Sequence, residues 1–217
     1  RILSSHPDVS SAGELPTFPQ LFKLLSGSTS KSGIDAETLK VAANIDPQAL
    51  GRFYLQSTRP ITGHRKRFID KAPSNYLMAG AILRALPHAR VICLRRHPMD
   101  TLIGNFKQIF PIDDPYYDYV YDLRATAMRI VNFDRTIKGW AAVLPANRFM
   151  ELSYESLVDG QEAETRRLLA FCGLPWDDRC LNFHENTAGV GTPSARQVRS
   201  AIFRTAVGRW EKYGTLL

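Results

Sequence analysis

Several features that would narrow the function are scarce or missing in this sequence. Its three cysteines, Cys93, Cys172 and Cys180, have no metal-ligand spacing, and an odd number does not suit a framework of disulfide bonds. They lie in apolar stretches, so we expect core thiols in a reducing, cytoplasmic compartment, and no metal site. No apolar run approaches the eighteen or so residues of a membrane span, so we expect no membrane partner.

The chain also lacks segments that direct export or form repeats. It begins Arg1-Ile2-Leu3 without Met, and no signal or transit peptide follows. We therefore expect it to be part of a longer protein. No internal repeat is present, so any repeat domain would lie outside this chain. A hydrophobic content of 44% and a charged content of 23% over 217 residues indicate one globular domain, residues 1–217.

Acidic residues are outnumbered, since 28 Lys and Arg oppose 21 Asp and Glu and give a net charge of +7. Such a balance favours anionic partners. Nucleic acid is one class, but the basic residues are not interleaved with aromatic ones and zinc-finger spacing is missing. We expect no nucleic-acid partner. A small cofactor with several negative charges fits the charge equally well.

The most informative stretch, residues 67–100, has the pattern of a β-α-β unit. Phe68 and Ile69 end a short strand, and Ser74 is a suitable N-cap for a helix with apolar residues at i, i+4 and i+8. Pro87 closes this helix. The apolar run 91–94 then predicts a strand that is buried on both faces of a parallel sheet.

Cations follow both strands of this unit. Lys71 comes just after the first strand, and Arg95 and Arg96 come just after the second. Parallel sheets place ligand-binding groups beyond the carboxyl ends of their strands, so we expect these side chains to line a crevice for an anionic ligand.

The residues around these cations resemble one family. Asp70-Lys71, with Pro73 and Asn75, and the sequence RRHPMD about twenty residues later are similar to sulfotransferases that use 3′-phosphoadenosine 5′-phosphosulfate (PAPS). Within the family, the resemblance is closest to bacterial members associated with tetratricopeptide repeats and more distant to protein-tyrosine sulfotransferases. Further matches cover nearly the whole chain in family order: HPDV-x3-GE (6–14), SYESLV (153–158), LLAFCGLPWD (168–177), FHEN (183–186) and TPSARQVR (192–199).

This resemblance implies an α/β fold, in which helices flank a central parallel sheet as in nucleotide kinases with a P-loop. In the family, a loop that binds the 5′-phosphosulfate through backbone N–H groups immediately precedes the helix with which this chain begins. The sequence does not contain that loop. We therefore expect the domain to lack its first strand and its phosphate loop.

The resemblance also assigns two residues to the chemistry. Glu14, at the family distance from the His-Pro pair, is the expected base that takes the proton of the acceptor hydroxyl. Lys71 is expected to stabilise the charge that develops on the leaving phosphate, which it also binds. The alternatives are a solvated or helix-capping carboxylate for Glu14 and a surface lysine paired with Asp70 for Lys71.

A second set of residues is expected to bind the nucleotide. Arg96 matches the arginine that holds the 3′-phosphate, Tyr154 matches a tyrosine against the adenosine, and Ser194 and Arg199 lie in the segment that folds over the nucleotide. Gly104 stands where the family has a serine that also binds the 3′-phosphate, so backbone contacts or Asn105 would have to replace its hydroxyl. The alternatives are helix-capping for Arg96, plain packing for Tyr154 and a solvated loop for Arg199.

The expected function is transfer of a sulfuryl group from PAPS to the hydroxyl of an acceptor, by in-line displacement and without a metal. The acceptor can be a peptide, a glycan or a small molecule, and the sequence determines neither its identity nor the oligomeric state. One alternative is a degenerate nucleotide-binding module without activity, which the Gly104, Ala188 and Ala201 departures favour. The other is a kinase of related fold, which would need G-x4-GK-[ST].

Overall fold

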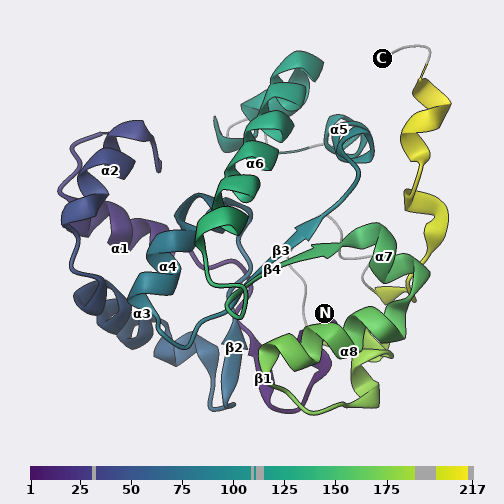
Figure 1. Ribbon diagram of the computed structural model, residues 1–217, viewed down its shortest axis with the longest axis horizontal. Helices are drawn as coiled ribbons and strands as arrows, with labels where there is room; N and C mark the ends of the chain where they lie inside the picture. The colour runs from purple at the N-terminus through teal and green to yellow at the C-terminus, as the bar shows by residue number, and fades with distance from the viewer. Residues whose placement is uncertain (31–32, 109, 111–114, 189–198, 215–217) are drawn as a thin grey trace. The chain divides into compact units, whose positions relative to one another are not determined.

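In a computed structural model of the protein, residues 1–30, 33–108, 110, 115–188 and 199–214 are described. The chain forms two compact units, and each unit combines two separate stretches. The first contains residues 1–91 and 165–201, and the second contains residues 92–164 and 202–217. In the described part of each unit, one pair of strands is hydrogen-bonded (Figure 1).

Short strands and longer helices alternate along the first unit. Strand β1 (Val9–Ser11) pairs in parallel with β2 (Arg67–Ile69), with Ser10 opposite Phe68. The other elements are η1 (Leu3–Ser5), α1 (Thr17–Ser26), α2 (Ala36–Val41), η2 (Ala42–Asn44), α3 (Pro47–Thr62), η3 (Pro73–Met78), α4 (Ala79–Ala85), η5 (Asp178–Cys180), η6 (Phe183–Glu185) and the end of α8 (Gln161–Cys172). A helix-rich unit with parallel strands agrees with the expected α/β class.

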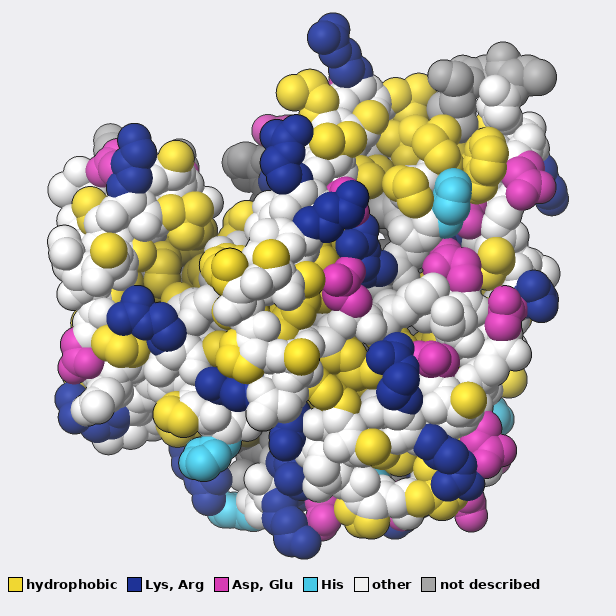
Figure 2. Space-filling view, viewed as in Figure 1, with side chains coloured by type: hydrophobic (Ala, Val, Ile, Leu, Met, Phe, Trp, Pro, Cys, Tyr) yellow, Lys and Arg dark blue, Asp and Glu magenta, His cyan; other side chains and the backbone are white. Residues whose placement is uncertain are grey.

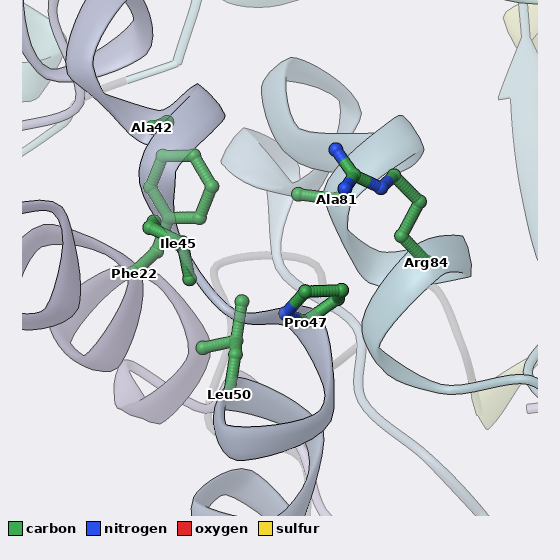
Figure 3. Close-up of a pocket in the computed structure, with 7 residues that line it drawn as sticks. All are labelled: Phe22, Ala42, Ile45, Pro47, Leu50, Ala81 and Arg84. Carbon is green, nitrogen blue, oxygen red and sulfur yellow. The ribbon is translucent and has the colours of Figure 1, made fainter.

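Helices α1, α3 and α4 enclose the core of the first unit. Phe18, Phe22, Leu50, Tyr54 and Met78 are buried together there, and the rings of Phe18 and Tyr54 meet edge to face at 5.4 Å. Beside this cluster lies a small hollow of about 220 Å³, including space open to solvent (Figure 3). It is lined by Phe22, Ala42, Ile45, Pro47, Leu50, Ala81 and Arg84.

Helix α3 extends over 16 residues, from Pro47 to Thr62. The side chain of Asp46 caps it by accepting the N–H groups of Gln48 and Ala49. The helix continues through Pro60, whose side chain is exposed. A proline inside a helix removes one backbone hydrogen bond, and its ring crowds the carbonyl four residues earlier. Buried residues on its inner face, including Tyr54 and Thr58, hold the last turns against the core.

The second unit is built around β3 (Val91–Arg95) and its partner β4 (Phe149–Ser153). The other elements are α5 (Pro98–Phe106), η4 (Pro115–Tyr121), α6 (Leu123–Val143), α7 (Tyr154–Asp159), the start of α8, η8 (Arg204–Ala206) and η9 (Arg209–Tyr213). Helix α5 packs against both α6 and the C-terminal η9. Asp122 caps α6 by accepting the N–H of Ala125 at 2.6 Å, as its position before the apolar series suggests.

Two local expectations are wrong. Ser74 lies inside η3 and not at an N-cap, since Pro73 starts that turn. Strand β3 is not buried on both faces, because the Leu94 side chain is exposed. Elsewhere, residues 9–11 form strand β1 because β2 supplies their backbone partners, and the C-terminal segment contains the short turns η8 and η9.

The three cysteines are free and buried, as the sequence indicates. Burial raises the pKa of Cys93 and that of Cys180 to about 11, so both thiols are protonated near neutral pH and poorly reactive. Among the helices of the described residues, none is long and apolar enough to cross a membrane.

Candidate functional site

The end of the β1–β2 pair brings Glu14 and Lys71 to the same place in the first unit. The parallel ladder continues past the strands, where Ala12 N–H donates to the Ile69 carbonyl at 2.9 Å and Lys71 N–H donates to the Gly13 carbonyl at 2.8 Å. Gly13 then turns the chain with a φ of 73°, a left-handed value that suits glycine. Glu14 and Lys71 are thus presented just beyond the carboxyl ends of two neighbouring strands.

The two side chains form an ion pair through Lys71 Nζ and Glu14 Oε1. The ion-pair partner of Lys71 is therefore Glu14 and not the neighbouring Asp70 that the alternative interpretation proposed. Both side chains are well exposed, at 56% for Lys71 and 41% for Glu14. An ion pair exposed to this degree is worth about 0–1 kcal/mol, so either partner can exchange it for a ligand at low cost.

Asp70 lies between these two residues and the core. One carboxylate oxygen accepts the N–H of Leu15 at 3.3 Å, and the other accepts the hydroxyl of Tyr54 at 2.8 Å. The side chain of Asn75 is a third hydrogen-bond partner. Burial raises the pKa of Asp70, while these hydrogen bonds oppose the rise. Sequence reasoning assigned no role to Asp70 or Asn75, although both belong to the motif that contains Lys71.

In the second unit, Arg95 and Arg96 have different environments, although they are adjacent. Arg95 donates to Glu151 at 2.7 Å and pairs with Asp134, which also pairs with Lys138 at 2.8 Å. This network raises the pKa of Arg95, chiefly through the hydrogen bond that its guanidinium donates to Glu151. Arg95 is therefore committed to an ion-pair network within its own unit.

The Arg96 guanidinium faces the C-terminal segment and Tyr154. Its Nη2 donates to the carbonyl of Ala206, and it lies 4.0 Å from Asp100 Oδ2 and 5.5 Å above the centre of the Tyr154 ring. Its Nε is buried without a hydrogen-bond partner in the described structure. A buried donor without a partner is costly, so the guanidinium retains unused capacity for an acceptor such as a phosphate oxygen.

Asp100 fixes the C-terminal segment on α5. This carboxylate is 1% exposed, and it accepts the backbone N–H groups of Gly208 at 2.8 Å and Trp210 at 3.0 Å. The indole of Trp210 also stacks on His97 at 5.4 Å. Sequence reasoning missed this docking. The only sequence signal was an aspartate four residues after Arg96, a spacing typical of residues on one helix face.

Gly104, in α5, lies beside Arg96, which precedes that helix. A Cβ at Gly104 would stand 3.5 Å from Arg96 Nη1, an ordinary contact distance, and its φ lies outside the left-handed range. The structure therefore brings the two residues together as the sequence predicts. The glycine leaves an open position next to the guanidinium that a larger side chain could occupy.

Tyr154 is the first residue of α7. The preceding Ser153 caps this helix, accepting the N–H of Ser156 at 3.2 Å and donating to Glu155 at 2.9 Å. Glu155 also accepts the N–H of His97 at 2.8 Å. Burial alone would raise the pKa of Glu155, but these hydrogen bonds lower it. Glu155 thus ties the start of α7 to the start of α5 and so holds Tyr154 near Arg96.

The remaining expected nucleotide contacts are the least defined. Ser194 lies outside the described residues. Arg199 is described and exposed. The structure provides no contact that links Arg199 to the other candidate residues.

Comparison with known proteins agrees with these motifs. The profile of the "Sulfotransferase family" matches residues 1–178. An uncharacterised protein from Aquifex aeolicus is 31% identical in an alignment of 217 positions that covers 98% of this chain and 28% of that protein. A protein-tyrosine sulfotransferase from Drosophila melanogaster is 21% identical in an alignment of 189 positions that covers 85% of this chain and 37% of that protein. The chain thus spans between about a quarter and two fifths of these curated relatives.

Two solved structures share the fold. A sulfotransferase domain from the curacin biosynthetic pathway matches with a TM-score of 0.56 and 16% identity, over 100% of this chain and 85% of that one. A sulfotransferase domain from the olefin synthase of Synechococcus PCC 7002 matches with a TM-score of 0.62 and 21% identity, over 97% of this chain and 80% of that one. At these identities the likeness concerns the fold alone.

Proposed function

Because the chain belongs to the sulfotransferase family, we propose that it is the sulfotransferase domain of a PAPS-dependent enzyme. The observation that supports this most directly is the juxtaposition of Glu14 and Lys71 beyond the ends of β1 and β2. A carboxylate and an ammonium side by side are the groups that sulfuryl transfer needs, one to accept a proton and one to stabilise a leaving phosphate.

In the proposed reaction, an oxygen of the acceptor forms a bond to sulfur as the bond from sulfur to the bridging oxygen of the donor breaks. Glu14 takes the hydroxyl proton of the acceptor. Lys71 leaves its ion pair and stabilises the charge on the departing phosphate, which also frees the carboxylate to act as a base. The weak, exposed ion pair makes this exchange inexpensive.

The second unit has the chemistry to hold the nucleotide. Arg96 combines a guanidinium, an unpartnered buried Nε and an open position at Gly104, a set that fits a phosphate group. Tyr154, whose pKa is raised by burial, offers an aromatic face for an adenine base. We propose the same nucleotide segment for Arg199 and, outside the described residues, for Ser194. The donor is the only cofactor in this proposal, which needs no metal.

The alternatives make different demands. On the face that Figure 2 shows, basic side chains are interspersed with acidic and hydrophobic ones, which does not favour a nucleic-acid partner. A degenerate nucleotide-binding module remains the second candidate, because Gly104 replaces the family serine. We propose no acceptor more specific than a compound with a hydroxyl group. The buried free thiols support the proposal of a reducing, cytoplasmic location.

The test separates binding from chemistry in the full-length protein. Calorimetry with 3′-phosphoadenosine 5′-phosphate measures nucleotide affinity, and transfer of labelled sulfate from PAPS to acceptors in a matched lysate measures turnover. Glu14→Gln should leave the affinity nearly unchanged and lower transfer by roughly 10²-fold or more, since only the base is lost. Binding without transfer in the unmodified protein would establish the degenerate module instead, and a fully active Glu14→Gln enzyme would refute the assignment of the base.

A further inference from the structure

Asp70 connects the backbone next to Glu14 and Lys71 with the hydrophobic core. It is the residue directly before Lys71, and its carboxylate accepts the N–H of Leu15, the residue directly after Glu14. Its other oxygen accepts the hydroxyl of Tyr54, which is only 3% exposed and packs against Phe18. One carboxylate therefore connects both site residues to a rigid aromatic cluster.

Little else in the described structure fixes the chain after Gly13. The parallel ladder ends with the bond from Lys71 N–H to the Gly13 carbonyl, and Gly13 itself is a conformationally permissive turn residue. The next backbone anchor is the bond between Leu15 N–H and Asp70, helped by the burial of the Leu15 side chain at 5% exposure. Glu14 lies between these two anchors, and its side chain, which is 41% exposed, pairs only with the exposed Lys71 among the described residues.

We propose that Asp70 is a positioning residue, which holds Glu14 and Lys71 at the spacing needed for sulfuryl transfer without contacting the reactants. This inference rests on the proposed function. A carboxylate suits the task because it accepts several hydrogen bonds at once, from Leu15, Tyr54 and Asn75. An amide at this position has a single acceptor oxygen and can keep only part of the set.

The consequence should appear in turnover more than in nucleotide binding. A misplacement of reacting groups by about 1 Å can cost on the order of 10²-fold in rate, because the alignment of the base with the acceptor is lost. Asp70→Asn should therefore lower kcat by roughly 10- to 100-fold and leave the affinity for 3′-phosphoadenosine 5′-phosphate within about threefold. Tyr54→Phe, which keeps the carboxylate but removes its core anchor, should have a smaller effect of the same kind.

The experiment combines kinetics with amide hydrogen exchange on the full-length protein. In Asp70→Asn, the Leu15 amide should exchange at least about tenfold faster, since its acceptor is weakened, while the ladder amides of Ala12 and Lys71 should not change. Asp8→Asn is the matched control, because Asp8 lies at the opposite end of the same strand pair and its side chain pairs with exposed Lys66. It should leave both the Leu15 exchange and kcat unchanged.

A double-mutant cycle distinguishes positioning from a general loss of stability. If Asp70 acts through Glu14, Asp70→Asn should cost several-fold less in a Glu14→Gln background, where the base is already lost. Unchanged exchange at Leu15, or unchanged kcat in an active enzyme, would overturn the proposal for Asp70 and leave the proposed function intact. A full-length wild-type protein that transfers no sulfate would overturn the proposed function and, with it, the catalytic consequence of Asp70.

Discussion

Replacing Gly104 by serine should strengthen nucleotide binding, which makes it a sharper test than a loss of function. The Cβ at this position would lie 3.5 Å from Arg96 Nη1, so a serine fits without displacing the guanidinium. Its hydroxyl would stand beside the group that we propose to bind the 3′-phosphate. The structure therefore predicts that a phosphate held by Arg96 gains one more donor.

The size of the gain follows from the type of bond. A hydrogen bond to a charged group is worth about 1.5–3 kcal/mol, and the serine must give up water and rotamer freedom, so the lower end applies. About 1.4 kcal/mol corresponds to a tenfold change in affinity, and we expect the Kd for 3′-phosphoadenosine 5′-phosphate to fall about tenfold. Serine also favours the helix by up to roughly 0.5–1 kcal/mol over glycine, which should raise the unfolding midpoint.

Gly104→Ala separates these two effects, because it adds the Cβ and the helix preference but no hydroxyl. Isothermal calorimetry should show an affinity near that of the unmodified protein for alanine and a higher affinity for serine, while both variants are more stable to urea. Equal affinities of the serine and alanine variants would refute the placement of the 3′-phosphate at Arg96. A weaker serine variant would refute it as well.

Two further predictions concern stability. Gly51→Ala should lower the free energy of unfolding by about 3 kcal/mol, because the added Cβ would lie 2.0 Å from the Ala85 carbonyl oxygen. This loss outweighs the gain of nearly 1 kcal/mol in helix preference. Gly139→Ala in α6 is the control, because its added Cβ would have nothing within 4 Å, and it should raise the free energy of unfolding. The urea concentration at the unfolding midpoint is the measurement. A higher midpoint for Gly51→Ala would contradict the close packing of α3 on α4. The pKa of Asp177 is lowered to about 2, chiefly by the hydrogen bond from Arg179. The contribution of Asp177 to stability is therefore present above its usual pKa of 3.8 and lost as the pH falls toward 2. In Asp177→Asn, the urea midpoint should fall less steeply over that pH range. An unchanged pH dependence of the midpoint would show that the pair of Asp177 and Arg179 adds nothing to stability.

The sequence by itself determined the parts of the molecule that depend on neighbouring residues. The apolar run at residues 91–94 forms a strand where the pattern predicts, because a hydrophobic run is a local property of the sequence. The family motifs likewise identified the fold class, since they are carried by the order of residues along the chain. The positions of Lys71 and Arg96 just after strands followed from the same reasoning.

Only the tertiary structure decided which distant residues meet. Strand β1 has just three residues, two of them serines, and nothing local marks it, because the backbone of β2 makes it a strand. The roles of Asp70 and Asp100 were hidden for the same reason, since Asp70 bonds Leu15 55 positions away and Asp100 bonds Gly208 108 positions away. A hydrogen bond between residues so far apart depends on how the whole unit packs, and no local sequence pattern contains that information.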